Sequence, residues 1–172
     1  MAGNQNGSSV VEALRSVPLF RAFSDQDEVL AALADNIKKK KVGSGIWLLK
    51  EGELGQKMFI LTKGQVEVTK TTLENEQYTV ASLGSEDQPF FGELALLDED
   101  RRSASIRTTS SCEVLELDRR DFESFGNRHP SAGLAIMREL AKIVCRRFRA
   151  TNGDVVRLFS ALVNEISQQE VS

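Results

Sequence analysis

The sequence predicts a mainly β fold: an antiparallel β-roll or jelly-roll of about eight short strands, flanked by α-helices. Three observations support this prediction. Short apolar runs separated by glycine-containing turns fill the middle of the chain. Apolar residues at helical spacing precede these runs, and a long series of apolar residues at alternating intervals of four and three follows them. A short helix inserted between strands and a long C-terminal helix complete the predicted architecture.

The composition is that of a soluble globular protein. Of the 172 residues, 41% are hydrophobic and 27% are charged, which suits one domain with or without a helical appendage. The net charge of -3 argues against a nucleic-acid surface as the main role of the chain. No apolar run is long enough to span a membrane, and the polar N-terminus lacks the pattern of a signal peptide. We therefore expect a cytoplasmic protein that contacts neither nucleic acid nor membrane.

The N-terminal part of the chain is expected to begin with a disordered segment that is followed by two helical segments. Residues 1–9 are small and mostly polar and are predicted to be disordered. Val10 to Arg15 fits a helical turn that ends before Pro18. Ser24 and Asp27 form a weak capping box for a helix over about residues 25–35.

The strand pattern begins at Ile37 and ends near Leu117. The basic run Lys38 to Lys41 is predicted to lie at the edge of a strand. Further strands are predicted over 46–49, 58–61, 66–68, 78–83, 103–109 and 113–117. Together with the helices before the strands and a short helix after them, the roll is predicted to span residues 10–126.

After the strands, residues 127–172 are predicted to form a long helical segment. Asp118 suits the cap of a short helix that ends at Gly126–Asn127, and Pro130–Ser131 then opens the long helix. Asn152-Gly153 is a turn signal, so the residues leave open whether the long helix breaks there.

The long helix carries a heptad seam, which predicts a parallel homodimer through this segment. The alternative is that the first half of the apolar stripe packs on the roll of the same chain. The seam residues are Met137, Ala141, Val144, Phe148, Thr151, Val155, Leu158 and Leu162.

The chain offers few residues for catalysis or metal binding. Cys112 and Cys145 are predicted to be reduced, buried thiols, and the single His129 has no neighbouring ligands in the sequence. The acidic segments 84–88 and 98–100 lack the spacing of a calcium loop and have no paired base or nucleophile. We therefore predict no catalytic residue, no metal site and no cofactor, and hence no enzyme.

The stretch from Phe90 to Arg107 holds residues that suit an anionic ligand. Gly92 lets backbone come close to a ligand, and Glu93 to Leu97 fits a helix of little more than one turn whose first amides point outward. Arg102 offers a planar fork of donors to two phosphate oxygens, whereas the carboxylate of Glu93 suits a sugar hydroxyl. The same residues also fit a solvated hairpin tip, and the pattern alone leaves both interpretations open.

The run Phe-Gly-Glu-Leu-Ala-Leu-Leu, followed by Arg-Ser-Ala, resembles the phosphate-binding cassette of cyclic-nucleotide-binding domains. This resemblance implies that Glu93 accepts the ribose 2′-hydroxyl, and that Arg102 and nearby amides hold the cyclic phosphate. It implies a regulatory module that signals through rearrangement of its C-terminal helices. The implied ligand-binding residues are Gly92, Glu93, Leu94, Ala95, Arg102, Ser103, Ala104, Thr151 and Asn152.

The resemblance favours cyclic AMP, with cyclic GMP as the alternative. Ser103 stands where cyclic-GMP kinases usually carry threonine and where the bacterial receptor of the family carries serine, so it does not settle the base. Thr151 and Asn152 fall where that receptor carries Thr-Ser against the adenine: Thr151 matches and Asn152 departs.

The sequence is also compatible with two other functions, and it does not identify the effector. The same fold also suits a scaffold that binds no ligand or another anion, and the acidic loops would suit a metal-dependent phosphodiesterase. About twenty residues follow Thr151, too few for a helix-turn-helix domain. The unknown effector is therefore either another protein or a domain outside this sequence.

Overall fold

The computed structural model describes residues 4–169, with side chains described from Ser9 to Ile166. The chain forms two compact units that divide between Ile136 and Met137. The first unit contains the N-terminal helices, the strands and the helix that follows them. The second unit contains most of the long helix.

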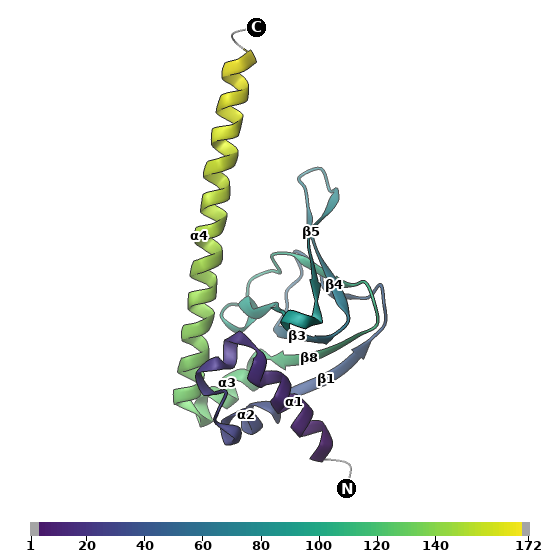
Figure 1. The fold of residues 1–172 in the computed structure, drawn as a ribbon, viewed down its shortest axis with the longest axis vertical. Helices are drawn as coiled ribbons and strands as arrows, with labels where there is room; N and C mark the ends of the chain where they lie inside the picture. Colours follow the sequence, from purple (N-terminus) through teal and green to yellow (C-terminus); the bar gives the residue numbers. More distant parts are fainter. Residues whose placement is uncertain (1–3, 170–172) are drawn as a thin grey trace. The chain divides into compact units, whose positions relative to one another are not determined.

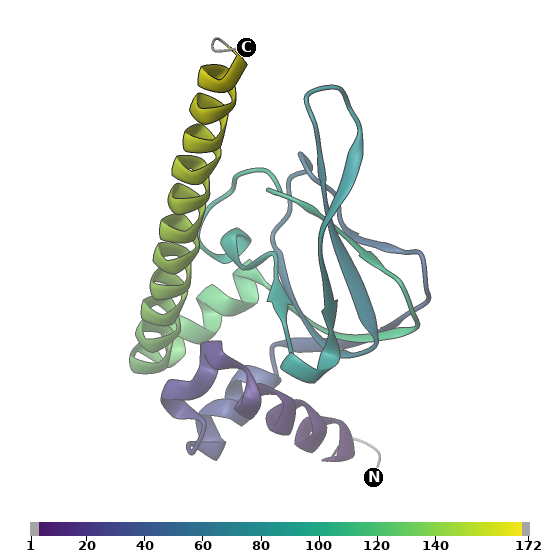
Figure 2. The ribbon, with the colours of Figure 1, turned by 45° about the horizontal axis from the view of Figure 1, so that its top comes forward.

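Eight strands form two four-stranded antiparallel sheets, ordered β1-β8-β3-β6 and β2-β7-β4-β5 (Figure 1). The hairpin of β4 and β5 extends beyond the rest of the roll (Figure 2). The predicted β-roll is confirmed, and the lysine run forms the edge strand β1. The strands are β1 Ile37–Val42, β2 Trp47–Leu49, β3 Lys57–Lys63, β4 Gln65–Thr71, β5 Gln77–Gly84, β6 Phe90–Phe91, β7 Ser105–Thr108 and β8 Cys112–Asp118.

The apolar core of the roll places the two-residue strand β6. Phe91 pairs with Phe59 of β3, and the two rings stack with centroids 6.0 Å apart. Both side chains are buried with Leu49, Ile106 and other core residues from the two sheets. Because Phe91 is held from one side by hydrogen bonds and from the other by the core, the residue that follows it, Gly92, has a fixed position.

Three helical segments precede the strands: α1 (Asn4–Ser16), the 3₁₀ helix η1 (Pro18–Phe23) and α2 (Asp27–Ala34). The predicted disorder of residues 1–9 is wrong from Asn4 onward; residues 1–3 lie outside the described part of the chain. Val10 and Leu14 of α1 are buried. A turn anchored in this way supplies the costly nucleus of a helix, and polar residues then extend it toward the N-terminus.

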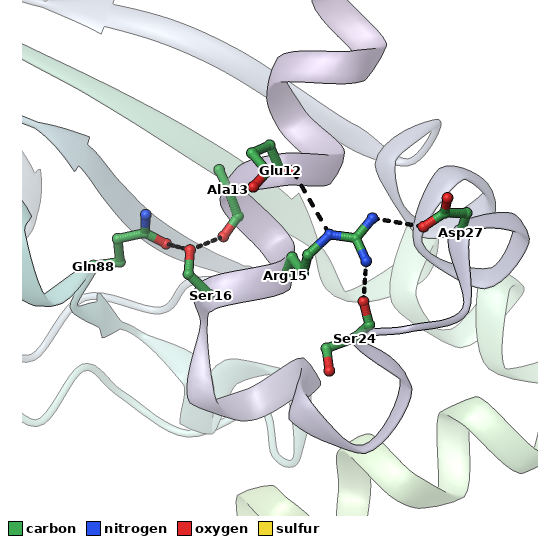
Figure 3. Close-up of polar contacts among 7 residues, drawn as sticks. All are labelled: Glu12, Ala13, Arg15, Ser16, Ser24, Asp27 and Gln88. Carbon is green, nitrogen blue, oxygen red and sulfur yellow. Dashed lines mark hydrogen bonds and ion pairs between the residues drawn. The ribbon is translucent and has the colours of Figure 1, made fainter.

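Arg15 ties α1 to the start of α2 (Figure 3). Its guanidinium donates to the carbonyl of Ser24 and to Oδ1 of Asp27, the latter at 2.5 Å. The hydrogen bond with Asp27 raises the pKa of Arg15. The predicted capping box of Ser24 and Asp27 does not form, because Gln26 is the N-cap of α2 and makes no side-chain cap bond. Both residues serve instead as acceptors for Arg15.

Helix α3 (Arg119–Arg128) follows β8 directly. The side chain of Asp118 accepts a hydrogen bond from the amide of Arg120 at 3.0 Å, as expected of the predicted cap. The predicted end at Gly126–Asn127 is wrong, since the helix continues to Arg128. Gly126 of α3 lies against Gly133: a Cβ added to Gly133 would be 2.9 Å from the Cα of Gly126. Gly126 therefore allows close packing against Gly133 and does not end the helix.

Helix α4 (Pro130–Gln169) opens at the predicted proline and runs without a break through Asn152-Gly153. The turn signal fails because the pair lies inside a 40-residue helix, where propagation adds one hydrogen bond per residue, and because Asp154 pairs with Arg157 one turn later at 3.1 Å. A single glycine costs a helix only about 1 kcal/mol, which such a neighbourhood offsets. No helix within residues 4–169 is both long and apolar enough to cross a membrane.

The two cysteines differ in their surroundings. Cys112 is buried, as predicted, and its thiol donates to the carbonyl of Gln65 at 3.3 Å. Cys145 is exposed, so the prediction of a buried thiol is wrong there. Its position follows Val144 of the heptad seam directly, and neighbouring helical positions point about 100° apart, so Cys145 does not share the apolar stripe.

A buried carboxylate on β8 pairs with two partly exposed lysines, one from β1 and one from β3. Glu116 is 4% exposed, and its carboxylate accepts from Nζ of Lys40 at 2.7 Å and from Nζ of Lys57 at 2.8 Å. Burial by itself raises the pKa of Glu116, but the hydrogen bonds from the two lysines outweigh burial and leave this pKa below its usual value. The hydrogen bond with Glu116 in turn raises the pKa of Lys57.

Replacing Glu116 by glutamine should lower the free energy of unfolding at pH 7 by about 2 kcal/mol, because a charged acceptor of two ammonium groups is lost. A carboxylate whose pKa is lower in the folded state stabilises the fold above its unfolded pKa, about 4.3. The stability difference between wild type and Glu116→Gln should therefore shrink as the pH falls below that value. Urea unfolding from pH 7 to pH 3 measures it, with the exposed Glu28→Gln as control, and a pH-independent difference would contradict the assignment.

Candidate functional site

The turn between β6 and the 3₁₀ helix η3 (Glu93–Leu96) depends on a glycine. Gly92 adopts the left-handed conformation, with φ +73°. An added Cβ would lie 2.9 Å from Nη1 of Arg102 and 2.9 Å from the carbonyl oxygen of Lys57. Only glycine meets both conditions, because it tolerates positive φ and has no side chain to collide with these atoms.

Arg102 reaches back across this turn, as the sequence predicts. Its half-buried guanidinium donates from Nη1 to the carbonyl of Gly92 at 3.1 Å and from Nη2 to the carbonyl of Lys57 at 2.7 Å. A guanidinium has five N–H donors, so these two bonds hold it in place without exhausting its capacity. Burial lowers the pKa of Arg102, and the carboxylate of Glu93 opposes that effect.

The loop between β2 and β3 fixes the backbone of Arg102 from both sides. The amide of Gly52 donates to the carbonyl of Arg102 at 3.0 Å, and the amide of Arg102 donates to the carbonyl of Glu53 at 2.9 Å. A third hydrogen bond joins the same two segments: the amide of Glu51 donates to Oγ of Ser105 at 2.9 Å. The backbone of Arg102 is therefore fixed by hydrogen bonds to the β2–β3 loop.

Glu93 is the buried acid of the turn, with 2% exposure at the start of η3. Its carboxylate lies close enough to Arg102 to act on the guanidinium electrostatically. The two groups together combine a buried acceptor with a fork of donors. Such a pair has the chemistry to hold a hydroxyl and an oxyanion of one small molecule.

The other predicted ligand residues fall into two groups. Leu94 and Ala95 of η3 join Gly92 and Glu93 on one side of the turn, and the contact of Arg102 with Gly92 brings the segment with Ser103 and Ala104 beside them. The amide of Ala95 donates to the carbonyl of Gly92 at 3.2 Å, so a phosphate oxygen would have to replace that acceptor.

Thr151 and Asn152 are exposed residues of α4 in the second unit, and their contact with a base stays a prediction.

A cavity of about 480 Å³ adjoins the guanidinium of Arg102. Sequence reasoning missed the residues around it, of which Gly55 and Lys57 contact Arg102 directly. The signal that could have indicated these residues is Gly55, the second glycine of the segment Glu51 to Gly55. In the sequence this segment looks like an ordinary turn. The cavity is lined by Leu48, Leu49, Lys50, Glu53, Leu54, Gly55, Gln56, Lys57, Phe59, Arg102 and Asp118.

Within residues 4–169, no group of three or more histidine, cysteine, aspartate and glutamate side chains is placed to hold a metal ion.

The sequence is similar to those of known regulatory proteins and kinases. The chain is 36% identical over 124 residues to cGMP-dependent protein kinase, isozyme 1, of Drosophila melanogaster, covering 70% of this chain and 16% of the kinase. It is 30% identical over 136 residues to the cyclic AMP receptor protein of Thermus thermophilus, covering 79% of this chain and 59% of the receptor. The chain thus spans only part of each of these proteins.

Solved structures share the fold. The catabolite activator protein of Thermus thermophilus superposes with a TM-score of 0.71 at 31% identity, over 82% of this chain and 62% of that one. The N-terminal domain of a transcriptional regulator from Streptomyces coelicolor A3(2) gives a TM-score of 0.68 at 29% identity, over 83% of this chain and 94% of that one. The sequence profile of the cyclic nucleotide-binding domain matches residues 39–129, which include every strand from β2 to β8 and the whole Gly92–Arg102 turn. The chain therefore belongs to the cyclic nucleotide-binding domain family.

Proposed function

We propose that this chain is a regulatory module that binds cyclic AMP at the turn formed by Gly92, Glu93 and Arg102. The observation that carries the proposal is the guanidinium of Arg102, half-buried and held by the carbonyls of Gly92 and Lys57. Burial disfavours its positive charge, as the lowered pKa of Arg102 reflects. A nearby negative charge favours the charged form of the guanidinium, so the site favours a ligand with an oxyanion.

The charges of the turn suit a cyclic phosphodiester. One guanidinium and one carboxylate face a ligand that carries one negative charge and free ribose hydroxyls. In this proposal Arg102 and the amides of the turn bind the phosphate, while Glu93 accepts the 2′-hydroxyl. A doubly charged monophosphate would meet the carboxylate of Glu93 with unfavourable charge, so the linear nucleotide should bind more weakly.

The choice of cyclic AMP over cyclic GMP rests on the predicted contact of Thr151 with adenine. Calorimetric titration of the protein with cyclic AMP, cyclic GMP, 5′-AMP and inorganic phosphate tests both the site and the base. We expect cyclic AMP to bind most tightly and 5′-AMP to bind at least tenfold more weakly. If only phosphate binds, or nothing binds, the scaffold or other-anion hypothesis replaces the sensor. Release of 5′-AMP with magnesium or manganese present would support the phosphodiesterase hypothesis instead.

We also propose that the second unit joins two copies of the chain into a parallel homodimer. The predicted seam residues Phe148, Val155, Leu158 and Leu162 are all exposed on α4. Large apolar side chains in a continuous helical stripe of this length are seldom left in water, and a heptad spacing matches the same stripe of a second helix. The homodimer would act in the cytoplasm on an effector protein or an effector domain.

The signal is proposed to pass from the turn to helix α3. Arg119, the first residue of α3, donates its amide to the carbonyl of Gln56 at 2.8 Å, and its Nη1 lies 3.3 Å from Oε1 of Glu99 in the loop after η3. Its side chain is 19% exposed, so the charge of Arg119 is largely shielded from water. Nη1 itself is buried and makes no hydrogen bond. A small shift of the Glu99 loop would therefore change the energy of this contact.

Adding cyclic AMP should alter hydrogen exchange in residues 118–165, first of all in α3, because a shift of the turn moves the acid paired with Arg119. The variant Glu99→Gln should reduce the change in α3 severalfold, whereas Asp100→Asn in the same loop should preserve it. Exchange followed by mass spectrometry, with saturating ligand for each variant, measures both effects. Identical exchange with and without ligand in a protein that binds cyclic AMP would refute the proposed route.

A further inference from the structure

Gly55 lies against the guanidinium of Arg102. A Cβ placed on Gly55 would be 2.5 Å from Nε and 2.7 Å from Cζ of Arg102, distances that real Cβ atoms do not show. The φ angle of Gly55 lies outside the left-handed region, so the backbone itself does not require glycine. The three atoms nearest to such a Cβ all belong to Arg102, so the arginine is what limits the space at this position.

The contacts around the guanidinium are made by backbone on three sides. The carbonyls of Gly92 and Lys57 accept from Nη1 and Nη2, and the backbone of Gly55 packs against Nε and Cζ. No side chain takes part in these three contacts, so their geometry follows the main chain of the roll. An atom added at position 55 would remove one side of this frame while leaving the two carbonyls in place.

The fold itself should tolerate such an atom. The guanidinium is the end of a flexible side chain, so it can swing away from a new methyl group without moving the backbone. Alanine also suits the φ angle of Gly55 and restricts the unfolded chain, which favours stability. A substitution at position 55 should therefore move Arg102 and spare the rest of the molecule.

We propose that Gly55 is a positioning residue for Arg102: by lacking a side chain it lets the guanidinium lie flat on the β2–β3 loop, in the orientation that meets the ligand phosphate. This inference rests on the proposed binding of a cyclic nucleotide. It assigns a role to a loop glycine that lies 47 positions before the arginine in the sequence.

The test compares Gly55→Ala with the matched control Gly43→Ala. Gly43 also has a φ outside the left-handed region, and an added Cβ there would meet no heavy atom within 4 Å. Calorimetric titration should show about tenfold weaker binding of cyclic AMP to Gly55→Ala, equivalent to about 1.4 kcal/mol, and unchanged binding to Gly43→Ala. Urea unfolding should show that both variants are at least as stable as the wild type, because alanine restricts the unfolded chain at each position. Unchanged affinity in Gly55→Ala would overturn the proposal.

A double-mutant cycle separates action through Arg102 from any other effect of the methyl group. In an Arg102→Ala background, Gly55→Ala should cause no further loss of affinity. In an Arg102→Lys background the loss should be small, because lysine has no planar guanidinium to collide with residue 55. An equal loss in all three backgrounds would mean that position 55 acts through the loop and not through the arginine.

A readout without ligand keeps the inference distinct from the proposed function. The Nε–H signal of Arg102 in a nitrogen-15 NMR spectrum can be assigned by its disappearance in Arg102→Lys. This signal should shift in Gly55→Ala and stay in place in Gly43→Ala. If the wild-type protein binds no cyclic nucleotide, the proposed function fails while the NMR result still tests the placement. A signal that does not move in Gly55→Ala overturns the inference in either case.

Discussion

Replacing Arg102 by alanine should weaken the binding of cyclic AMP by about 30-fold to several thousand-fold, the equivalent of 2–5 kcal/mol. The guanidinium lies directly against the Gly92 turn, with Nη1 at 3.1 Å from the carbonyl of Gly92. Without it, the phosphate would enter a partly desolvated site beside the carboxylate of Glu93 and would lose the guanidinium that balances its charge. Calorimetric titration of wild type and variant at one salt concentration measures the loss.

The adjacent arginine provides the control for this experiment. Arg101 is exposed and donates from Nη1 to the carbonyl of Gly52 at 2.6 Å, a contact on the β2–β3 loop. Arg101→Ala removes the same charge from the same segment and should change affinity by no more than a few-fold. Equal losses in the two variants would indicate long-range electrostatics in place of a specific contact. If Arg102→Ala binds like the wild type, the nucleotide binds elsewhere.

Replacing Leu158 by glutamate should shift the proposed homodimer to monomer, raising its dissociation constant by at least 100-fold. Leu158 lies on the heptad seam and is 71% exposed in the single chain. In a parallel pair, the two copies of this residue would face each other across the seam, so two carboxylates would replace two leucines. Like charges brought together at an interface cost several kcal/mol, which is consistent with a change of this size. Sedimentation equilibrium over a range of protein concentrations measures the dissociation constant.

Asn164→Glu is the matched control for the seam. Asn164 is also exposed on α4, but it lies outside the four-three pattern, and the substitution adds the same charge. We expect it to preserve the dimer. A wild-type protein that sediments as a monomer at every concentration would rule out the homodimer, and equal dissociation by both variants would show that net charge and not the seam is responsible.

Features that depend on near neighbours in the chain were predictable. The cap of α3 at Asp118 needs only the amide of Arg120, two residues away, and Pro130 starts a helix because its fixed φ and missing N–H suit the first turn. Alternation and turn residues likewise indicated the strands and the position of Gly92. The same local rules fail where packing overrides them: Gly126 looks like a helix end but allows contact with Gly133, and Asn152-Gly153 looks like a turn but lies inside α4.

The partners of the site residues were beyond such reasoning. Residue types and the family cassette pointed to Arg102 and Glu93, but not to the carbonyl of Lys57, 45 positions away, which holds the guanidinium. Lys57 in turn bonds to Glu116, 59 positions along the chain. These contacts follow from strand register and from the path of the β2–β3 loop, because only the folded backbone sets which distant carbonyl faces which donor. Local sequence thus determined the elements and the chemistry of the turn, whereas tertiary packing decided how the arginine is held and why position 55 is glycine.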